Sequence, residues 1–186
     1  MKILSFLILI FLFNSSHAIQ TGSVTGLELP RYVSLKSYES NIRVGPSKNY
    51  PINIRYIVEN YPLRIIDEHK DWRKVEDFQN NIGWIHKSLI KSDRNGIIIS
   101  DKNNNIIVYD SVFEKIIGEI EKGSIIQILK CKSNWCCIKK NGHKGWVEKK
   151  NIWGVRDKEV FNLSYFQMFI DLYFRSINFI EFYIIR

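Results

Sequence analysis

Short runs of β-branched and aromatic residues, broken by polar turn residues, follow one another through the middle of the chain. They lie at 42–44, 63–66, 72–75 and 83–85 in the first half, and at 125–129, 135–138 and 145–147 in the second. Asn141-Gly142, between the last two runs, is a strong signal for a tight β-hairpin. Because the runs recur about every ten residues without a sustained helical period, they predict an all-β barrel or sandwich.

The two halves of this region are two copies of one unit. Three blocks of the first copy recur in the same order in the second, at offsets of 62 to 64 positions: 41–44 with 105–108, 71–75 with 134–138, and 83–85 with 145–147. Small insertions in turns explain the changing offset. The pattern predicts two tandem barrels of about 60 residues, each with a small core.

The first copy carries a specific set of motifs: Asn41-Ile42-Arg43-Val44-Gly45-Pro46-Ser47, Tyr50-Pro51, Asp71-Trp72 and Gly83-Trp84-Ile85. This set resembles the bacterial SH3-like (SH3b) domain, whose usual pattern is an L-N-V-R-x-G-P-S opening, a G-x-W-x-x-V strand and a closing G-W-V. The second copy has Ile107-Val108-Tyr109-Asp110 in place of the opening but keeps the tryptophan strand and the closing motif. The whole resembles exported two-module proteins of alphaproteobacteria, and it implies SH3-like barrels at 29–91 and 95–156.

The resemblance also implies a binding function, since bacterial SH3-like barrels bind elongated ligands on an aromatic surface between loops and commonly recognise cell-wall peptides. The candidate ligand-binding residues are Tyr50, Tyr61, Trp72 and Trp84 in the first unit, and Tyr109, Trp135 and Trp146 in the second. Trp72 and Trp135 each begin a strand after a turn, which favours an exposed position. For Trp84 and Trp146 we favour a place in the barrel core over a place on the surface.

The first eighteen residues form the three-part pattern of a secretory signal peptide. Met1-Lys2 supplies a positive start, and residues 3–13 form an uncharged apolar run that is too short to span a bilayer. Small residues then lead to Ala18. We expect cleavage after this residue and a periplasmic or secreted mature chain; a buried N-terminal strand or helix is the less favoured alternative.

All three cysteines lie between positions 131 and 137. Export implies an oxidising compartment, where paired cysteines normally form disulfides. Cys131 and Cys136 flank a turn-like segment, and two strands that meet there would place them opposite each other at a distance that a disulfide tolerates. We therefore predict a Cys131–Cys136 disulfide and a free Cys137. A metal site would need four ligands, and His143 does not complete one.

Charge and motifs narrow the function further. The sequence holds 27 Lys and Arg against 19 Asp and Glu, a net charge of +8 that suits an acidic partner. Mutational enrichment of lysine explains this charge equally well.

We find no phosphate-binding loop, zinc signature or dinucleotide fingerprint, and Asp67, Glu68 and Asp71 fit a solvated loop. We expect no enzyme activity, no metal, no cofactor and no nucleic-acid partner; an enzyme with Cys137 as a free thiol is the least favoured hypothesis.

The tail from 157 to 186 is rich in Phe, Tyr, Ile and Leu. Its polar residues recur at spacings of three and four, which predicts a helix with one polar face: Ser164, Gln167, Asp171, Arg175, Asn178 and Glu181. Three interpretations stay open for this helix. It lies in the interface of the inner membrane, it packs on a barrel or a second chain, or it is read-through from a decaying gene.

Together these patterns predict an exported, non-catalytic binding protein of the cell envelope. Its partner would be a peptidoglycan peptide or an envelope protein, recognised by loop aromatics with the help of positive charge. The alternative is an accessory or scaffold subunit that the tail tethers to the inner membrane and whose barrels dock a partner enzyme.

Overall fold

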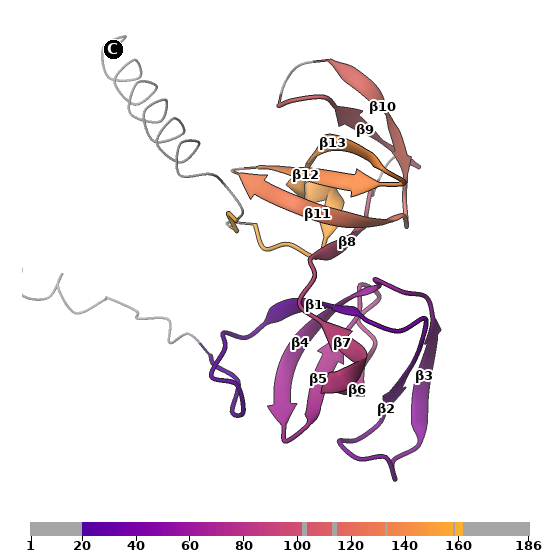
Figure 1. Ribbon diagram of the computed structural model, residues 1–186, viewed down its shortest axis with the longest axis vertical. Helices are drawn as coiled ribbons and strands as arrows, with labels where there is room; N and C mark the ends of the chain where they lie inside the picture. The colour runs from indigo at the N-terminus through magenta and orange to yellow at the C-terminus, as the bar shows by residue number, and fades with distance from the viewer. Residues whose placement is uncertain (1–19, 102–103, 113–114, 133, 158, 162–186) are drawn as a thin grey trace, which may run out of the picture.

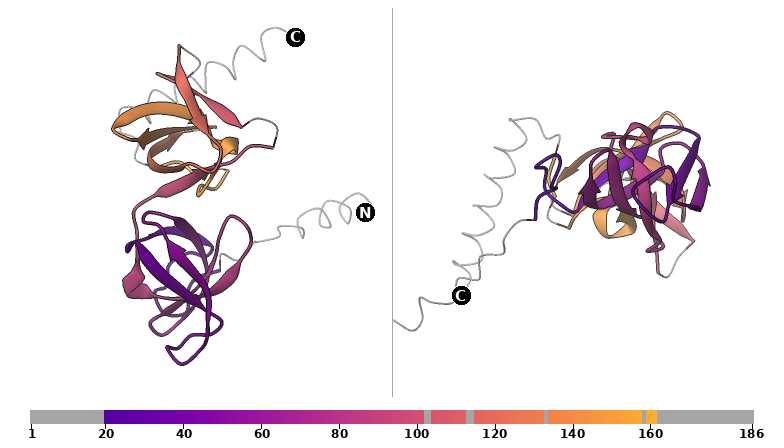
Figure 2. Two further views of the ribbon diagram at one scale, coloured as in Figure 1. Left: turned by 90° about the vertical axis from the view of Figure 1, so that its right-hand side faces the viewer. Right: turned by 90° about the horizontal axis from the view of Figure 1, so that it is seen from below.

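The computed structural model describes residues 20–101, 104–112, 115–132, 134–157 and 159–161. Over these ranges the chain is built almost entirely from β-strands, with the short 3-10 helices η2 (Lys87–Leu89) and η3 (Lys149–Asn151). The strands form two antiparallel sheets of seven strands, one in each half of the chain (Figures 1 and 2). The predicted all-β class and the tandem arrangement of two units are confirmed.

The two sheets have the same topology. The first runs in the order β3-β2-β6-β5-β4-β1-β7 and the second in the order β10-β9-β13-β12-β11-β8-β14. The first sheet comprises β1 (Arg31–Leu35), β2 (Glu39–Arg43), β3 (Ile52–Ile57), β4 (Pro62–His69), β5 (Trp72–Glu76), β6 (Ile82–His86) and β7 (Ile90–Lys91). The second comprises β8 (Asn95–Ile98), β9 (Asn105–Tyr109), β10 (Ile116–Glu121), β11 (Ile125–Lys132), β12 (Trp135–Lys140), β13 (His143–Glu148) and β14 (Ile152–Trp153). Each strand of one unit therefore has its counterpart seven strands later.

Two predicted segments lie outside the described residues: the signal peptide at 1–18 and the helix of the C-terminal tail. The last residue of the tail that the structure describes is Phe161. It forms a β-bridge with Cys131 of β11, in which the backbone amide of each residue donates to the carbonyl oxygen of the other. In the ranges that the structure describes, no helix has the length and apolar character needed to cross a bilayer.

Each unit has its own hydrophobic core, filled from the alternating inward positions of its strands. The core of the first unit is formed by Leu29, Val33, Leu35, Ile42, Leu63, Ile65, Val75 and Ile85. The core of the second is formed by Ile98, Ile106, Ile120, Ile126, Ile128, Cys131, Cys136, Ile138, Val147, Ile152 and Val155. Since the two sets share no residue, each barrel is stabilised by its own burial of apolar surface.

In each barrel a glycine lies next to the single register pair that joins two neighbouring strands, β2 with β6 and β9 with β13. A Cβ atom on Gly83 of β6 would lie 2.3 Å from Cγ2 of Ile42 and 2.9 Å from the carbonyl oxygen of Arg43, both on β2. A Cβ atom on Gly145 of β13 would lie 2.3 Å from Cγ1 of Val108 on β9. Only glycine lets β6 approach β2, and β13 approach β9, this closely.

The linker between the units is anchored by Arg94. Its guanidinium donates to both carboxylate oxygens of Glu159, at 2.5 and 2.9 Å. The same group lies 5.8 Å from the ring centroid of Tyr32 in β1 and 4.8 Å from that of Phe161. Tyr32 also meets the edge of Trp153, with ring centroids 5.2 Å apart. One cation therefore joins the first unit to the end of the second.

A second group of polar contacts supports the same junction. The buried side chain of Asn95 donates to Oγ of Ser34 at 2.9 Å, and that hydroxyl donates to the carbonyl oxygen of Asp93 at 2.8 Å. Arg156, after the second sheet, forms an ion pair with Glu28, before the first. Buried polar groups that are fully paired hold one geometry more strictly than apolar contacts do.

Replacing the closing glycine should destabilise the first barrel. Gly83→Ala forces a methyl group against Ile42 and the backbone of Arg43, so we expect a loss of about 1–3 kcal/mol in the free energy of unfolding. Chemical denaturation followed by tryptophan fluorescence measures it. The matched control is Gly118→Ala, where an added Cβ atom meets no heavy atom within 4 Å and the change should stay within about 0.5 kcal/mol. Equal effects of the two substitutions would contradict the steric explanation.

Candidate functional site

The outer face of β4, β5 and β6 carries an array of tryptophan and histidine side chains. His69, Trp72 and His86 are register neighbours in one row across the three strands. The rings of Trp72 and His86 meet edge to face with centroids 5.4 Å apart, and those of His69 and Trp84 with centroids 6.5 Å apart. Edge-to-face packing of this kind fixes the rings in place while leaving part of each face exposed.

A pocket of about 450 Å³ lies beside this array, between the β2–β3 loop and the β4–β5 turn. It is lined by Pro46, Ser47, Lys48, His69, Lys70, Asp71, Trp72 and His86. Asp71 forms an ion pair with Lys87 at 2.8 Å, which lowers the pKa of its carboxyl and offsets its charge. The other charged side chains in the lining are lysines, so the pocket combines an aromatic wall with net positive charge and suits an anionic or carboxylate-bearing ligand.

Tyr50 belongs to the same end of the barrel. Its ring packs on Gly45, where an added Cβ atom would lie 2.7 Å from the ring, and its carbonyl oxygen accepts a 2.6 Å hydrogen bond from Arg43. The side chain is 46% exposed. These contacts hold the β2–β3 loop, with Pro46 and Ser47, against the strands and so shape one wall of the pocket.

Tyr61 lies elsewhere. Its ring packs against Tyr56, with centroids 4.7 Å apart, and against Phe78. The hydroxyl of Tyr56 donates to Asp77 at 2.6 Å, and burial raises the pKa of both tyrosines. Tyr61 does not line the pocket, and its role is to cover the core beside β3. Of the four candidates in the first unit, Trp72 lines the pocket. Trp84 lies in the array beside it, Tyr50 packs on the β2–β3 loop, and Tyr61 is separate from all three.

In the second unit Tyr109, Trp135 and Trp146 lie together. Trp146 is the register neighbour of Tyr109, and Tyr109 meets Trp135 edge to face with centroids 5.3 Å apart. Tyr109 also lines a separate pocket of about 480 Å³ between β9 and η3. Trp135 is only 6% exposed, so its predicted surface position is wrong: Tyr109 covers it.

The favoured core position of Trp84 and Trp146 is also wrong. Both lie half-buried on the outer face of their strands. The reason is the alternation of a strand. Because Gly83 and Gly145 face inward at the closure, the tryptophan that follows each of them must face outward.

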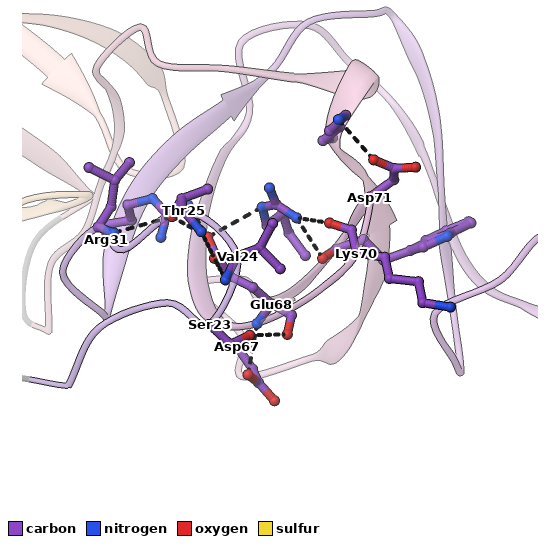
Figure 3. A network of polar contacts seen from close by, with 12 residues as sticks. Ser23, Val24, Thr25, Arg31, Asp67, Glu68, Lys70 and Asp71 are labelled. Atoms are coloured by element: carbon purple, nitrogen blue, oxygen red, sulfur yellow. Dashed lines mark hydrogen bonds and ion pairs between the residues drawn. The ribbon is translucent and has the colours of Figure 1, made fainter.

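A buried carboxylate organises the turn that carries Trp72 (Figure 3). Glu68 accepts hydrogen bonds from the amides of Val24 and Thr25 at 3.0 and 2.8 Å, and from Arg31 at 2.5 Å. It also forms an ion pair with Arg73. Burial alone would raise the pKa of Glu68, but the hydrogen bonds from Arg31 and Thr25 lower it to about 2. The expected solvated loop is therefore wrong for this residue.

Arg73 connects Glu68 to the backbone of the β4–β5 turn. Its Nη1 atom donates to the carbonyl oxygens of Lys70 and Trp72, each at 2.9 Å. Lys70 has a positive φ of 49°, a conformation that costs free energy for a residue with a side chain. The amide of Lys87 closes the turn from the other side by donating to the carbonyl oxygen of Asp71 at 2.8 Å. The backbone next to Trp72 is thus fixed from within the barrel.

The second unit has a covalent bond where the first has this ion pair. Cys131 pairs with Cys136 in the register of β11 and β12, as Glu68 pairs with Arg73 in β4 and β5. The structure joins Cys131 to Cys136 and leaves Cys137 free and buried, so the predicted disulfide is confirmed. Burial raises the pKa of the Cys137 thiol, and a protonated thiol is a poor nucleophile.

Comparison with known proteins fits this architecture. Residues 36–92 and 113–154, just over half of the chain, match the model of the bacterial SH3 domain. The chain belongs to the bacterial SH3 domain family. Bacterial SH3 domains commonly bind components of the cell wall. No curated protein matches the chain, and its predicted place in the exported group of alphaproteobacteria stays a prediction.

Solved structures that match the chain do so over part of their own length. NlpC2 from Trichomonas vaginalis is 15% identical, with 72% of this chain and 51% of that chain covered and a TM-score of 0.31. NlpC1 from the same organism is 13% identical, with coverages of 76% and 51% and a TM-score of 0.30. An NlpC/P60 family protein from Bacillus cereus is 12% identical, with coverages of 72% and 59% and a TM-score of 0.28. The chain spans between half and three fifths of the length of these proteins.

Removing the buried carboxylate should destabilise the first SH3 domain and change its response to acid. We expect Glu68→Gln to cost about 2–3 kcal/mol at neutral pH, because it leaves Arg31 and Arg73 without their counter-charge. The folded-state pKa lies below the ordinary 4.5, so this contribution is present above that pH and is lost as the pH falls towards about 2. Denaturation curves of both proteins across this range should therefore converge.

The control for this substitution is Glu39→Gln. Glu39 forms an ion pair with Arg55 in which both side chains are more than half exposed, and its loss should cost less than about 0.5 kcal/mol. A wild-type advantage over Glu68→Gln that stays constant down to pH 2 would contradict the assignment of the charge to Glu68.

Proposed function

We propose that this chain is an exported, non-catalytic binding protein of the cell envelope that recognises a peptide stem of peptidoglycan. The observation that carries the proposal is the pocket between the β2–β3 loop and the β4–β5 turn, with Trp72 as its aromatic wall. Family membership supports a cell-wall component as the general class of ligand. The proposal narrows the class of ligand to a peptide and assigns its binding surface to one end of the first domain.

The chemistry of the pocket favours a short peptide with free carboxylates. Lys48 and Lys70 supply positive charge, and His69 and His86 add hydrogen-bonding groups to the lining. The Trp72 ring offers a flat apolar face and an N–H donor to the backbone of an extended peptide. Cell-wall peptide stems combine an extended backbone with carboxylate groups, and both features have a counterpart here.

The non-catalytic part of the proposal rests on the environment of Cys137. This thiol is buried and has a raised pKa, which is the opposite of what a nucleophilic cysteine needs. The export part rests on the signal-peptide pattern of residues 1–18. An envelope protein that presents an extended acidic segment is the alternative ligand for the same pocket.

The test is co-sedimentation with purified peptidoglycan. We expect Trp72→Ala to weaken binding about tenfold, since it removes the aromatic wall. The protein should stay folded, with a melting temperature within about 5 °C of the wild type. Trp135→Ala should instead cost about 3–5 kcal/mol in stability, because this ring is buried.

The matched control is Tyr38→Ala, which removes an aromatic ring that is 61% exposed and does not line the pocket. It should leave both binding and stability unchanged. If the wild type binds peptidoglycan and Trp72→Ala binds equally well, the site lies elsewhere. If the wild type does not bind peptidoglycan at all, the peptide proposal is wrong and an envelope protein becomes the ligand to seek.

A further inference from the structure

The outer face of β11, β12 and β13 carries four lysines around one tryptophan. Lys130, Cys137 and Trp146 are register neighbours across the three strands, and Lys139 and Lys144 are neighbours in the next row. Side chains that are paired in register, or two apart along a strand, point to the same side of a sheet. Lys132, two positions after Lys130, therefore shares this face. We call this set, Lys130, Lys132, Lys139, Lys144 and Trp146, the lysine face.

The lysines lie close to the tryptophan ring. The Nζ atom of Lys130 is 5.2 Å from the ring centroid of Trp146, and that of Lys132 is 5.3 Å from it. Lys139 and Lys144 are exposed beside them. Among the described residues none of the four forms an ion pair with a carboxylate, whereas Glu148, the acidic residue of the neighbouring row, pairs with Lys150.

The first domain shows that the fold does not require this charge. The positions that correspond to the four lysines hold Asp67, His69, Glu76 and Ile82 in the register of β4, β5 and β6. Glu76 there forms an ion pair with Arg64 at 2.5 Å. The same face of the same fold is therefore close to neutral in one domain and strongly positive in the other.

Four lysines without a carboxylate partner among the described residues repel one another, and the two cation–π contacts with Trp146 offset this repulsion only in part. The lysines create a concentrated positive potential that attracts polyanions. The potential reaches Cys137 beneath them, where Lys130 and Lys144 oppose the effect of burial on the thiol pKa. This side of the sheet has an acidic member, Glu148, but its carboxylate pairs with Lys150, so it does not neutralise the four lysines, and a binding function explains the charge that is left.

We propose that the lysine face binds an acidic polysaccharide, a linear glycan with carboxylate groups along its length. The lysines would pair with successive carboxylates, and the Trp146 ring would hold the ammonium groups of Lys130 and Lys132 in position for this pairing. The lysine face lies on a different domain from the peptide pocket, so this inference does not depend on the proposed function.

The geometry favours a glycan over two other polyanions. Trp146 is half-buried and has two ammonium groups over its ring, so it cannot insert into the acyl region of a membrane as an interfacial aromatic does. Single-stranded nucleic acid binds where several exposed aromatics form a stacking platform. Here Trp135 shares the face, in register with Lys132, but it is buried, so of the two tryptophans there Trp146 alone is partly exposed.

The test is titration of the full chain with a linear oligouronate, followed by calorimetry. We expect binding that weakens as salt rises from about 50 to about 500 mM. Lys130→Gln combined with Lys132→Gln should weaken binding about tenfold, and Lys139→Gln combined with Lys144→Gln should do the same. The matched control, Lys36→Gln combined with Lys115→Gln, makes the same charge change at two exposed lysines outside the face and should change affinity less than about twofold.

Several outcomes would overturn the proposal. One is an equal loss of affinity in the control pair, which would show a general charge effect. Others are equal binding of a neutral maltooligosaccharide, or tighter binding to phosphatidylglycerol vesicles or to a single-stranded oligonucleotide than to the oligouronate. Trp72→Ala should leave oligouronate binding unchanged, so failure of the peptide pocket and failure of the lysine face are distinguishable.

Discussion

Each barrel depends on a strand crossing that has no room for a side chain. At Gly83 and Gly145 the closing strand passes so near its neighbour that a single methyl group would collide with it. Because side chains alternate along a strand, this local steric limit also decides the orientation of the residues on either side. Trp84 and Trp146 face outward for that reason, and the outer face of each domain acquires its central aromatic ring from a requirement of the core.

A second constraint acts near the turn of the β4–β5 hairpin and of its counterpart, the β11–β12 hairpin. A β-bulge in β4 and another in β11 shift the alternation of each strand, so that an inward-facing pair follows the bulge. In one domain this pair is Glu68 and Arg73, and in the other it is Cys131 and Cys136. An ion pair and a disulfide thus occupy one position of the repeat. The bulge in β11 also turns lysines outward that an unbroken alternation would have buried.

Much of this architecture follows from the sequence. Hydrophobic runs, turn residues and the internal repeat predict two all-β units, and the spacing of Cys131 and Cys136 predicts their bond. The errors concern which face a residue occupies. Periodicity alone does not reveal a bulge, so Glu68 looked like a solvated residue, and it does not reveal that Tyr109 covers Trp135. The four lysines of the second domain were not recognised as a group, because only the strand register brings 130 and 132 next to 139 and 144.

The junction around Arg94 bears on the simultaneous use of the two proposed binding sites. A flexible tether lets two sites search a volume, and their effective concentration then falls with linker length. Here the guanidinium of Arg94, in the linker, contacts both Glu159 and Tyr32, so packing at the junction restricts the distance between the two domains. If both domains bound one partner, avidity would be available only to a partner whose binding groups are spaced to match that distance.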